Sequence, residues 1–262
     1  MEALQQSGVG NLLLRYCTAE DFALLQPSLS RTHLEVRAPL YETNRPIQTV
    51  YFPEGGVASI VAEQNGGDKV ETGLFGLDGM SGTAVVLGAG QSPLHSMIQI
   101  DGAPSIQISA AKFDSACDRS TSLRKLMLRF VQAMNVQAAS TAAANAHYAL
   151  PERLARWLLM CHDRVDGDQL ELTHEFMSMM LAVRRSSVTV TLHALEGTGA
   201  IRSARGAILI LDRGRLEEFA GESYGEAERE YQRLIGPFGK GAEMRNNTNL
   251  GYGIRGQHLF DR

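Results

Sequence analysis

The stretch from Leu172 to Glu196, LTHEFMSMMLAVRRSSVTVTLHALE, constrains the architecture more than any other part of this 262-residue chain. Its apolar spacing predicts two short helices that meet at a tight corner. Thr173 suits the N-cap of the first helix, which we expect to run from His174 to Leu181. We expect the second helix to run from Arg184 to Glu196, because Gly197 follows and ends it.

The spacing of Val188, Leu192 and Leu195 defines the buried side of the second helix. The residues that remain outside are Ser186, Val190 and His193, flanked by Arg185 and Thr189, and Arg184 begins the helix. Arginine can pair with guanine through two hydrogen bonds, hydroxyl groups can bond bases or phosphates, and an exposed valine can pack on a thymine methyl group. The two helices therefore have the form of a helix-turn-helix whose second helix reads the major groove of DNA.

A hairpin is predicted directly after these helices. The sequence AIRSARGAILIL contains two β-prone runs around Ala204-Arg205-Gly206. Arg202 and Arg205 of this wing are available to phosphates. From Arg184 to Arg205 the chain holds four arginines and one acid, Glu196, so positive charge gathers here.

The plain alternative is a helical hairpin with solvated arginines, and a two-helix pattern alone would favour it. The corner, the wing and the local positive charge together favour DNA binding. The chain as a whole carries a formal net charge of -4, so its bulk composition neither supports nor excludes a nucleic-acid partner.

Cysteine usage and hydropathy argue against several other classes of protein. Cys17, Cys117 and Cys161 are widely spaced and odd in number, which indicates neither a disulfide framework nor a thiolate metal site. No stretch approaches the roughly 20 apolar residues of a membrane span, and the N-terminus lacks the pattern of an export signal. We therefore expect a cytoplasmic protein with no membrane partner.

The first half of the chain changes its pattern at about Leu34. From Asn11 to Gln26 leucines recur at helical spacing, and Thr18 with Asp21 suits a helix start, so we expect one or two short helices. Up to Ile108, short β-prone runs then alternate with glycine-rich turns: TVYFPEGG, VASIVAEQNGGDKVETGLFG, TAVVLGAG and SMIQIDGAPSIQI. This alternation predicts an antiparallel β-barrel or sandwich.

A long helix is predicted over residues 120–148, where Leu123, Met127 and Phe130 recur at intervals of four and three. Its second half, QAASTAAANAHYA, is small and weakly apolar, and small side chains let a second helix approach closely. We expect dimerisation along this helix, and docking on the chain's own barrel is the alternative. Pro151 then opens a further helix, PERLARWLLMCHDRV, and marks a domain boundary.

These patterns divide the chain into four parts and give an α+β fold class. Residues 1–119 hold the N-terminal helices and a sensor-type β-barrel, residues 120–148 the long helix, and residues 151–220 the winged helix-turn-helix. Residues 221–262 hold a charged helix and then, from Gly236, a glycine- and asparagine-rich tail that we expect to be mobile.

The order of barrel, long helix and winged helix-turn-helix, with RLARWLL ahead of LTHEFMSMMLAVRRSSVTVTLHALEGTGAIR, resembles the Crp/Fnr family of bacterial transcription regulators. The resemblance covers about Leu24 to Leu216 and is most specific in the DNA-binding part. It implies a jelly-roll barrel of the cyclic-nucleotide-binding type and a homodimer.

Base-reading positions are also implied by this resemblance. Arg185, Ser186 and Val190 occupy them, whereas His174 and Glu175 lie near the positions that contact the DNA backbone. Ser186 and Val190 stand where the best-known members carry an acid and a second arginine. We therefore expect a different operator from theirs.

The resemblance implies an effector pocket in the barrel. Family barrels often hold a cyclic nucleotide with a glycine-led turn, a glutamate and an arginine-serine pair. Gly79 and Gly82 match the turn, Met80 stands at the glutamate position, and His95 and Ser96 fall near the arginine-serine pair. Methionine accepts a ribose hydroxyl proton poorly, and a neutral histidine holds phosphate more weakly than a guanidinium does. We therefore predict no control by cyclic AMP, and the effector stays open.

Other sensors and enzymes find little support in the sequence. An iron-sulfur cluster needs about four thiolates, which the three cysteines do not supply. His33, His95 and His147 are each able to ligate haem iron, but a lone histidine is more often a surface or core residue. A metal enzyme of the cupin type needs clustered histidines, and the seven histidines form no H-x-H pair. We predict no cofactor, no metal site and no enzymatic activity.

The sequence thus predicts a homodimeric transcription regulator that binds double-stranded DNA at a roughly palindromic site. It would pair with itself through residues 120–148 and, as an activator, would contact RNA polymerase. The alternative is a small-molecule receptor whose barrel binding is its main activity. The DNA interface is expected to comprise Thr173, His174, Glu175, Arg184, Arg185, Ser186, Thr189, Val190, His193, Arg202 and Arg205.

Overall fold

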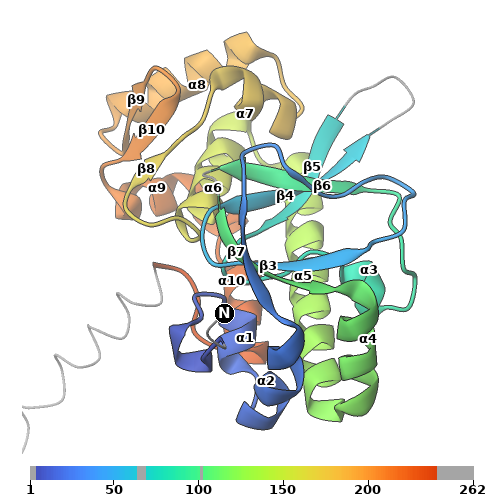
Figure 1. The fold of residues 1–262 in the computed structure, drawn as a ribbon. Helices are drawn as coiled ribbons and strands as arrows, with labels where there is room; N and C mark the ends of the chain where they lie inside the picture. The colour runs from blue at the N-terminus through green and yellow to red at the C-terminus, as the bar shows by residue number, and fades with distance from the viewer. Residues whose placement is uncertain (1–3, 64–68, 101–102, 241–262) are drawn as a thin grey trace, which may run out of the picture.

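The computed structural model describes residues 4–63, 69–100 and 103–240 (Figure 1). Thr18 begins a helix by accepting a hydrogen bond from the Asp21 amide at 3.1 Å, so the predicted N-terminal helices are confirmed. The N-terminal segment consists of the 3-10 helix η1 (Gln6–Gly8), the helices α1 (Leu12–Tyr16) and α2 (Ala19–Leu25), and the 3-10 helix η2 (Gln26–Ser28).

Two antiparallel sheets form the body of the N-terminal domain. The first sheet holds, in order, β1 (Ser30–Leu34), β7 (Ala103–Ser109) and β3 (Thr49–Pro53). The second holds, in order, β2 (Pro39–Tyr41), β6 (His95–Ile100), β4 (Val57–Glu63) and β5 (Lys69–Phe75). Phe52 and Ile106 of the first sheet share one buried core with Phe75 and Ile98 of the second. The predicted antiparallel β architecture is therefore confirmed.

One predicted β-prone run is a helix. TAVVLGAG begins with α3 (Thr83–Val86), so its prediction as a strand is wrong. Gly82 precedes α3 with a φ of 77°, a left-handed conformation that glycine adopts readily, and Val85 and Val86 are then buried. A short apolar run does not distinguish a strand from a buried helical turn. A further helix that was not predicted, α4 (Ala110–Arg119), leads from β7 toward the long helix.

The long helix α5 runs from Thr121 to His147, close to the predicted bounds, and Ser120 caps it. One side of α5 packs on β5 and on the C-terminal helix α10 (Glu226–Leu234), and Met127 of this side is fully buried. The small residues of its second half stay exposed on the other side: Ala138, Ala139, Ala142, Ala143 and Ala146. The helix thus docks on its own chain and leaves a second surface open.

The C-terminal domain begins with α6 (Leu150–His162), in which Pro151 lies in the first turn. Leu170 pairs with Ile208, which adds the short strand β8 (Gln169–Leu170) to the predicted two-stranded wing. The other elements are α7 (His174–Met180), α8 (Arg185–Gly197), α9 (Arg213–Ala220) and a sheet of β8 (Gln169–Leu170), β10 (Ala207–Ile210) and β9 (Ile201–Ala204).

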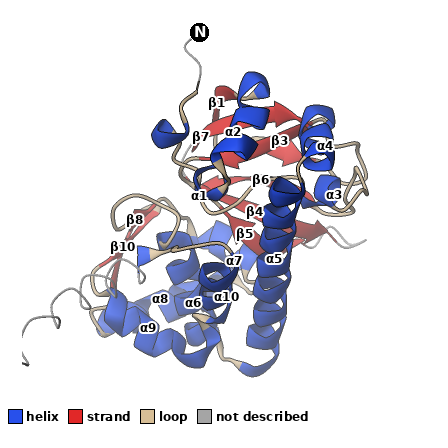
Figure 2. Cartoon of the chain, turned by 90° about the horizontal axis from the view of Figure 1, so that it is seen from below, coloured by secondary structure: helices blue, strands red, loops and turns tan. Residues whose placement is uncertain are grey.

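This domain docks directly on the second sheet, with α7 beside β5 (Figures 1 and 2). Val57, Val61, Leu74 and Ile100 of the sheet form one core with side chains of α6, α7 and α8, and all four are 0% exposed. Burial of this many apolar groups fixes the docking by the hydrophobic effect. The C-terminal domain and the β domain therefore meet through a continuous apolar interface.

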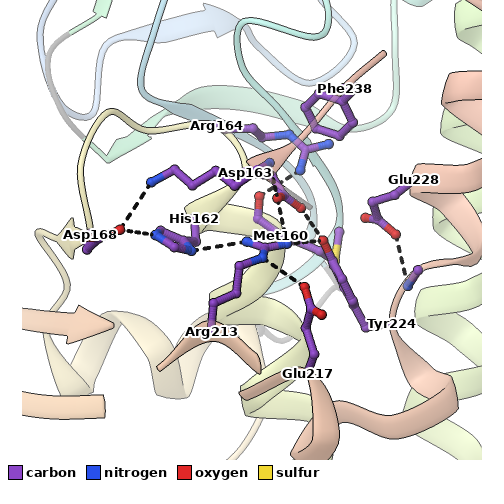
Figure 3. A network of polar contacts seen from close by, with 12 residues as sticks. Met160, His162, Asp163, Arg164, Asp168, Arg213, Glu217, Tyr224, Glu228 and Phe238 are labelled. Atoms are coloured by element: carbon purple, nitrogen blue, oxygen red, sulfur yellow. Dashed lines mark hydrogen bonds and ion pairs between the residues drawn. The ribbon is translucent and has the colours of Figure 1, made fainter. Parts of the chain in front are cut away.

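A buried ion pair also joins the two domains. Arg164, two residues after the end of α6, donates to Asp78 at 3.0 Å from Nε and 2.6 Å from Nη2. The Arg164 guanidinium lies 4.8 Å from the centre of the Phe238 ring (Figure 3). Tyr231 of α10 donates its hydroxyl proton to the Asp78 carbonyl at 2.7 Å. The C-terminal segment thus covers the ion pair between the domains.

The prediction of a mobile tail from Gly236 is wrong for residues 236–240. Phe238 is 4% exposed because it packs against Arg164 and lies 5.0 Å from the Tyr231 ring. Tyr16 of α1 donates to the Pro237 carbonyl at 2.7 Å. The rest of the predicted tail lies outside the described residues.

The three cysteines are buried and form no disulfide. Burial raises the pKa of Cys17 to about 12 and that of Cys117 to about 11, which disfavours their thiolates. Within the described ranges, no helix is long and apolar enough to cross a membrane.

Candidate nucleic-acid interface

Local hydrogen bonds set the start of α7, the first helix of the pair. Thr173 caps it, accepting from the Phe176 amide at 3.2 Å, as predicted. Met177 and Met180 are buried beneath the helix, whereas Glu175 is exposed in its first turn. The helix ends at Met180, one residue before the predicted end.

The corner between the helices depends on Ala182, which has a φ of 53°. Its amide donates to the Met179 carbonyl at 3.2 Å, and the Val183 amide donates to the Ser178 carbonyl at 2.9 Å. A left-handed conformation is costly for a residue with a Cβ atom. The two hydrogen bonds and the buried methionines hold Ala182 in it, and Arg184 then forms the N-cap of α8.

The second helix, α8, has the two sides that the sequence predicts. Val188, Leu192 and Leu195 are at most 1% exposed. On the opposite side, Val190 is 70% exposed, an unusual position for a β-branched apolar residue. Four further predicted reader residues are exposed on this helix and its N-cap: Arg184, Arg185, Ser186 and His193. The geometry therefore presents a mixed apolar and cationic surface.

A hydrogen-bond chain fixes the remaining predicted reader, Thr189. Its hydroxyl donates to the Arg185 carbonyl at 3.2 Å, and its oxygen lies 3.0 Å from Nδ1 of His174 on α7. Both His174 and Thr189 are half-buried. The structure thus brings the start of the first helix against the reading helix.

Glu196 connects the reading helix to the wing. One carboxylate oxygen accepts from the Ser203 amide of β9 at 2.6 Å, and the other lies 3.2 Å from Nδ1 of His193. Arg202 and Arg205 of the wing are exposed, and Gly206 closes the hairpin with a φ of 79°. Glu196, the one acid between Arg184 and Arg205, is therefore hydrogen-bonded to the wing.

A polar network that was not predicted from the sequence joins α9 to the C-terminal end of α6 (Figure 3). Arg213 of α9 donates to Asp163 at 2.9 Å and to the Tyr224 hydroxyl at 2.8 Å. It also donates to Nδ1 of His162 at 3.1 Å, and Nε2 of His162 lies 2.9 Å from Asp168. Burial lowers the pKa of His162, which agrees with a neutral ring that accepts from Arg213. Only the helical spacing of Arg213 and Glu217 hinted at this network in the sequence.

The predicted effector cassette lies in a filled part of the N-terminal β domain. Met80 is 1% exposed and belongs to the main core. A Cβ atom on Gly79 would lie 2.6 Å from Cζ of Phe130, so α5 packs directly on this turn. Gly82 has a φ of 77°, which the turn into α3 requires. A side chain thus fills the space beside the glycine-led turn.

The two polar residues of the cassette lie on β6. His95 is half-buried, and its pKa is lowered by burial and by the charge of Lys69. Ser96 is fully buried. A mainly neutral imidazole at this place agrees with the expected weak hold on a phosphate group.

The other two histidines considered for haem lie apart from the core. The His33 side chain is 56% exposed and lies 3.8 Å from Glu35, and His147 is exposed at the end of α5. In the part of the chain that the structure describes, no three His, Cys, Asp or Glu side chains gather around a common point that would hold a metal ion.

Comparison with known proteins identifies the DNA-binding part. Residues 152–219 match the family of Crp-like helix-turn-helix domains. No curated protein matches the chain by sequence.

Solved structures share the fold of the longer chain. A transcriptional regulator of the CRP family from Thermus thermophilus has 18% identity and a TM-score of 0.62, over 74% of this chain and 98% of that one. The regulator FixK2 from Bradyrhizobium japonicum has 15% identity and a TM-score of 0.60, over 74% and 98%. The c-di-GMP-responsive global regulator CLP from Xanthomonas campestris has 15% identity and a TM-score of 0.59, over 74% and 99%.

The fold is a winged helix-turn-helix domain, with an exposed second helix, joined to an N-terminal β domain. Residues 152–219 are a Crp-like helix-turn-helix domain, and the fold of the longer chain is shared with solved regulators of the Crp/Fnr family. The predicted resemblance is therefore confirmed.

Proposed function

We propose that this regulator binds a roughly palindromic DNA site as a homodimer, with α8 of each copy in a major groove. The observation that supports the proposal is the two-sided burial of α8. Arg185, Ser186 and Val190 are exposed to solvent, whereas the opposite face is buried. Arg185 would pair with guanine, and Val190 would contact a thymine methyl group. Arg202 and Arg205 of the wing would contact phosphates.

The open side of α5 supports the homodimer. Its exposed alanines, from Ala138 to Ala146, would let a second α5 approach closely, because small side chains leave the backbone accessible. Leu128, on the same helix, is 41% exposed and would be covered by the partner. Two paired α5 helices would set the distance between the two reading helices.

The filled cassette supports a signal other than cyclic AMP. Met80 and Phe130 occupy core positions at the turn where a nucleotide phosphate would bind. A ligand there would have to displace both side chains. Cyclic AMP at millimolar concentration should therefore leave the DNA affinity of the regulator unchanged.

Selection of bound fragments from genomic DNA tests the function. The enriched fragments should share an inverted repeat with half-sites about one helical turn apart, and their affinity should fall steeply with salt. A protein that enriches no common sequence, and binds random and selected duplexes equally, would not be a sequence-specific regulator.

The dimer is tested separately by the mass in solution at micromolar concentration. Ala139→Glu combined with Ala143→Glu places charges on the open side of α5 and should give monomers. Ala89→Glu, an exposed alanine between α3 and β6, is the matched control and should stay dimeric. A single-chain mass for the unmodified protein would disprove the homodimer.

A further inference from the structure

A small cavity lies where the long helix α5 meets α6 and the end of α7. Thr141 and Asn145 of α5, Arg153 and Arg156 of α6 and Met180 of α7 are among the residues that line it. Its volume is about 20 Å³. A cavity needs about 10 to 15 Å³ to hold one water molecule, so this one has room for a single water or for an ion of similar size.

Two arginines give the cavity a positive wall. Arg156 donates from Nε to the Ser223 carbonyl at 2.9 Å and from Nη2 to the Thr141 hydroxyl oxygen at 3.1 Å. Arg153 donates from Nη2 to the Leu181 carbonyl at 2.8 Å, but its Nε is buried and has no acceptor among the described residues. A buried N–H group that lacks an acceptor is costly, and more so when it belongs to a charged side chain.

The charge of Arg153 is not balanced within the described part of the chain. No carboxylate there lies within ion-pair distance of its guanidinium, and burial lowers its pKa. The acid that lines the cavity is Glu71, whose two oxygens accept from Ser59 and Trp157. Burial raises the pKa of Glu71 to about 7, so this carboxyl is mostly neutral at pH 6. The cavity therefore combines an unpaired cation, an unmet N–H donor and space for one small particle.

We propose that this cavity binds a monovalent anion of halide size, which in a cell is chloride. The anion accepts the Nε hydrogen of Arg153 in a charge-assisted hydrogen bond, and Arg156 adds a second positive charge beside it. The side-chain amide of Asn145, which also lines the cavity, is a further donor. A phosphate or a nucleotide is too large for the space. The site goes beyond the proposed function and does not depend on DNA binding.

Binding at this place should stabilise the folded protein. The anion would contact side chains of both α5 and α6, and an ion that binds only the folded chain raises its stability by mass action. Once chloride exceeds its dissociation constant, each further tenfold rise in concentration should raise the melting temperature by about 4 °C.

The first test compares chloride with gluconate, an anion too large for the cavity. Thermal unfolding is followed at pH 6 while sodium gluconate is replaced by sodium chloride at constant ionic strength, which keeps the screening of surface charges unchanged. The melting temperature of the unmodified protein should rise with the chloride fraction. Arg153→Met keeps an unbranched apolar stem and removes the charge, so it should lose this rise. Arg45→Met, at an exposed arginine of the β domain, is the matched control and should keep it.

The second test locates the ion directly and needs no variant. Crystals of the unmodified protein grown in sodium bromide should show a bromine anomalous-scattering peak in the cavity, within hydrogen-bond distance of Nε of Arg153. This measurement decides the inference even if Arg153→Met does not fold.

Three outcomes would overturn the proposal. The first is a melting temperature that does not change when chloride replaces gluconate. The second is an equal rise in Arg153→Met and Arg45→Met, which would assign the effect to the general action of the salt. The third is a bromide peak at surface arginines only, with water in the cavity.

Discussion

Glu71 is a buried carboxyl group at the joint between the β domain and the DNA-binding domain, and its removal should change the pH dependence of stability. Its two oxygens accept from the Ser59 hydroxyl at 2.6 Å and from Nε1 of Trp157 at 2.8 Å. Burial raises the pKa of Glu71 to about 7, against the lowering effect of these hydrogen bonds and of the charges of Arg156 and Arg164.

The sign follows from linkage. Below a pH of about 4.5 the carboxyl is protonated in both the folded and the unfolded chain, and its burial carries no ionic penalty. Between that pH and about 7 the unfolded chain releases the proton and the folded chain retains it, so stability falls as the pH rises. The loss at pH 8 is about 3 kcal/mol, since each tenfold change in proton affinity is worth about 1.4 kcal/mol.

Glu71→Gln removes this penalty and keeps an acceptor for Trp157, because the amide oxygen can take the place of one carboxylate oxygen. The variant should exceed the free energy of unfolding of the unmodified protein by less than about 1 kcal/mol at pH 5 and by up to about 3 kcal/mol at pH 8. Trp157 is the single tryptophan of the chain, so urea titration followed by its fluorescence reports on this joint directly. Glu218→Gln, an exposed carboxyl on α9, is the control. A stability difference that stays constant from pH 5 to pH 8 would refute the reasoning.

Three further predictions concern the reading surface and the joint. Arg185→Ala should lower discrimination at one base pair per half-site by about 1 to 3 kcal/mol, whereas Arg205→Ala should weaken all sequences alike and reduce the salt slope; equal effects in competition binding would contradict these roles. Ala182→Gly should raise thermal stability by about 0.5 to 1 kcal/mol, because glycine adopts its positive φ without strain; a lower melting temperature would oppose this. Asp78→Ala leaves the buried Arg164 charge unpaired and should cost about 3 to 5 kcal/mol in a urea titration, unlike an exposed ion-pair deletion.

The reading helix was predictable because its signal is local. Val188, Leu192 and Leu195 repeat within two turns, and such a repeat determines which side is buried whatever the rest of the chain does. The hydrogen bond between His174 and Thr189 was not predictable in the same way, because it joins two helices across a corner whose angle depends on the conformation of Ala182. The sequence therefore predicts which residues of α8 face outward, but it does not predict the hydrogen bond that holds Thr189.

The contacts between the two domains could not be predicted from the sequence, for a different reason. Arg164 and Asp78 are separated by 86 positions, and a charged pair has no periodic pattern that would reveal its burial. Phe238 stands in a glycine-rich segment whose composition predicts mobility, yet its ring covers the Arg164 guanidinium. Composition describes the average tendency of a segment and misses one aromatic anchor.

This joint bears on how a signal could reach the DNA. The reading helix shares a core with Val57 and Leu74 of the β domain, so it moves with that domain unless the core and the Arg164–Asp78 pair both open. In a dimer paired through α5, such an opening would alter the distance between the two reading helices. It would leave unchanged the side chains that contact the DNA bases. A signal that acts at the joint would therefore change which half-site spacing is tolerated, while Arg185 and Val190 would still select the same bases.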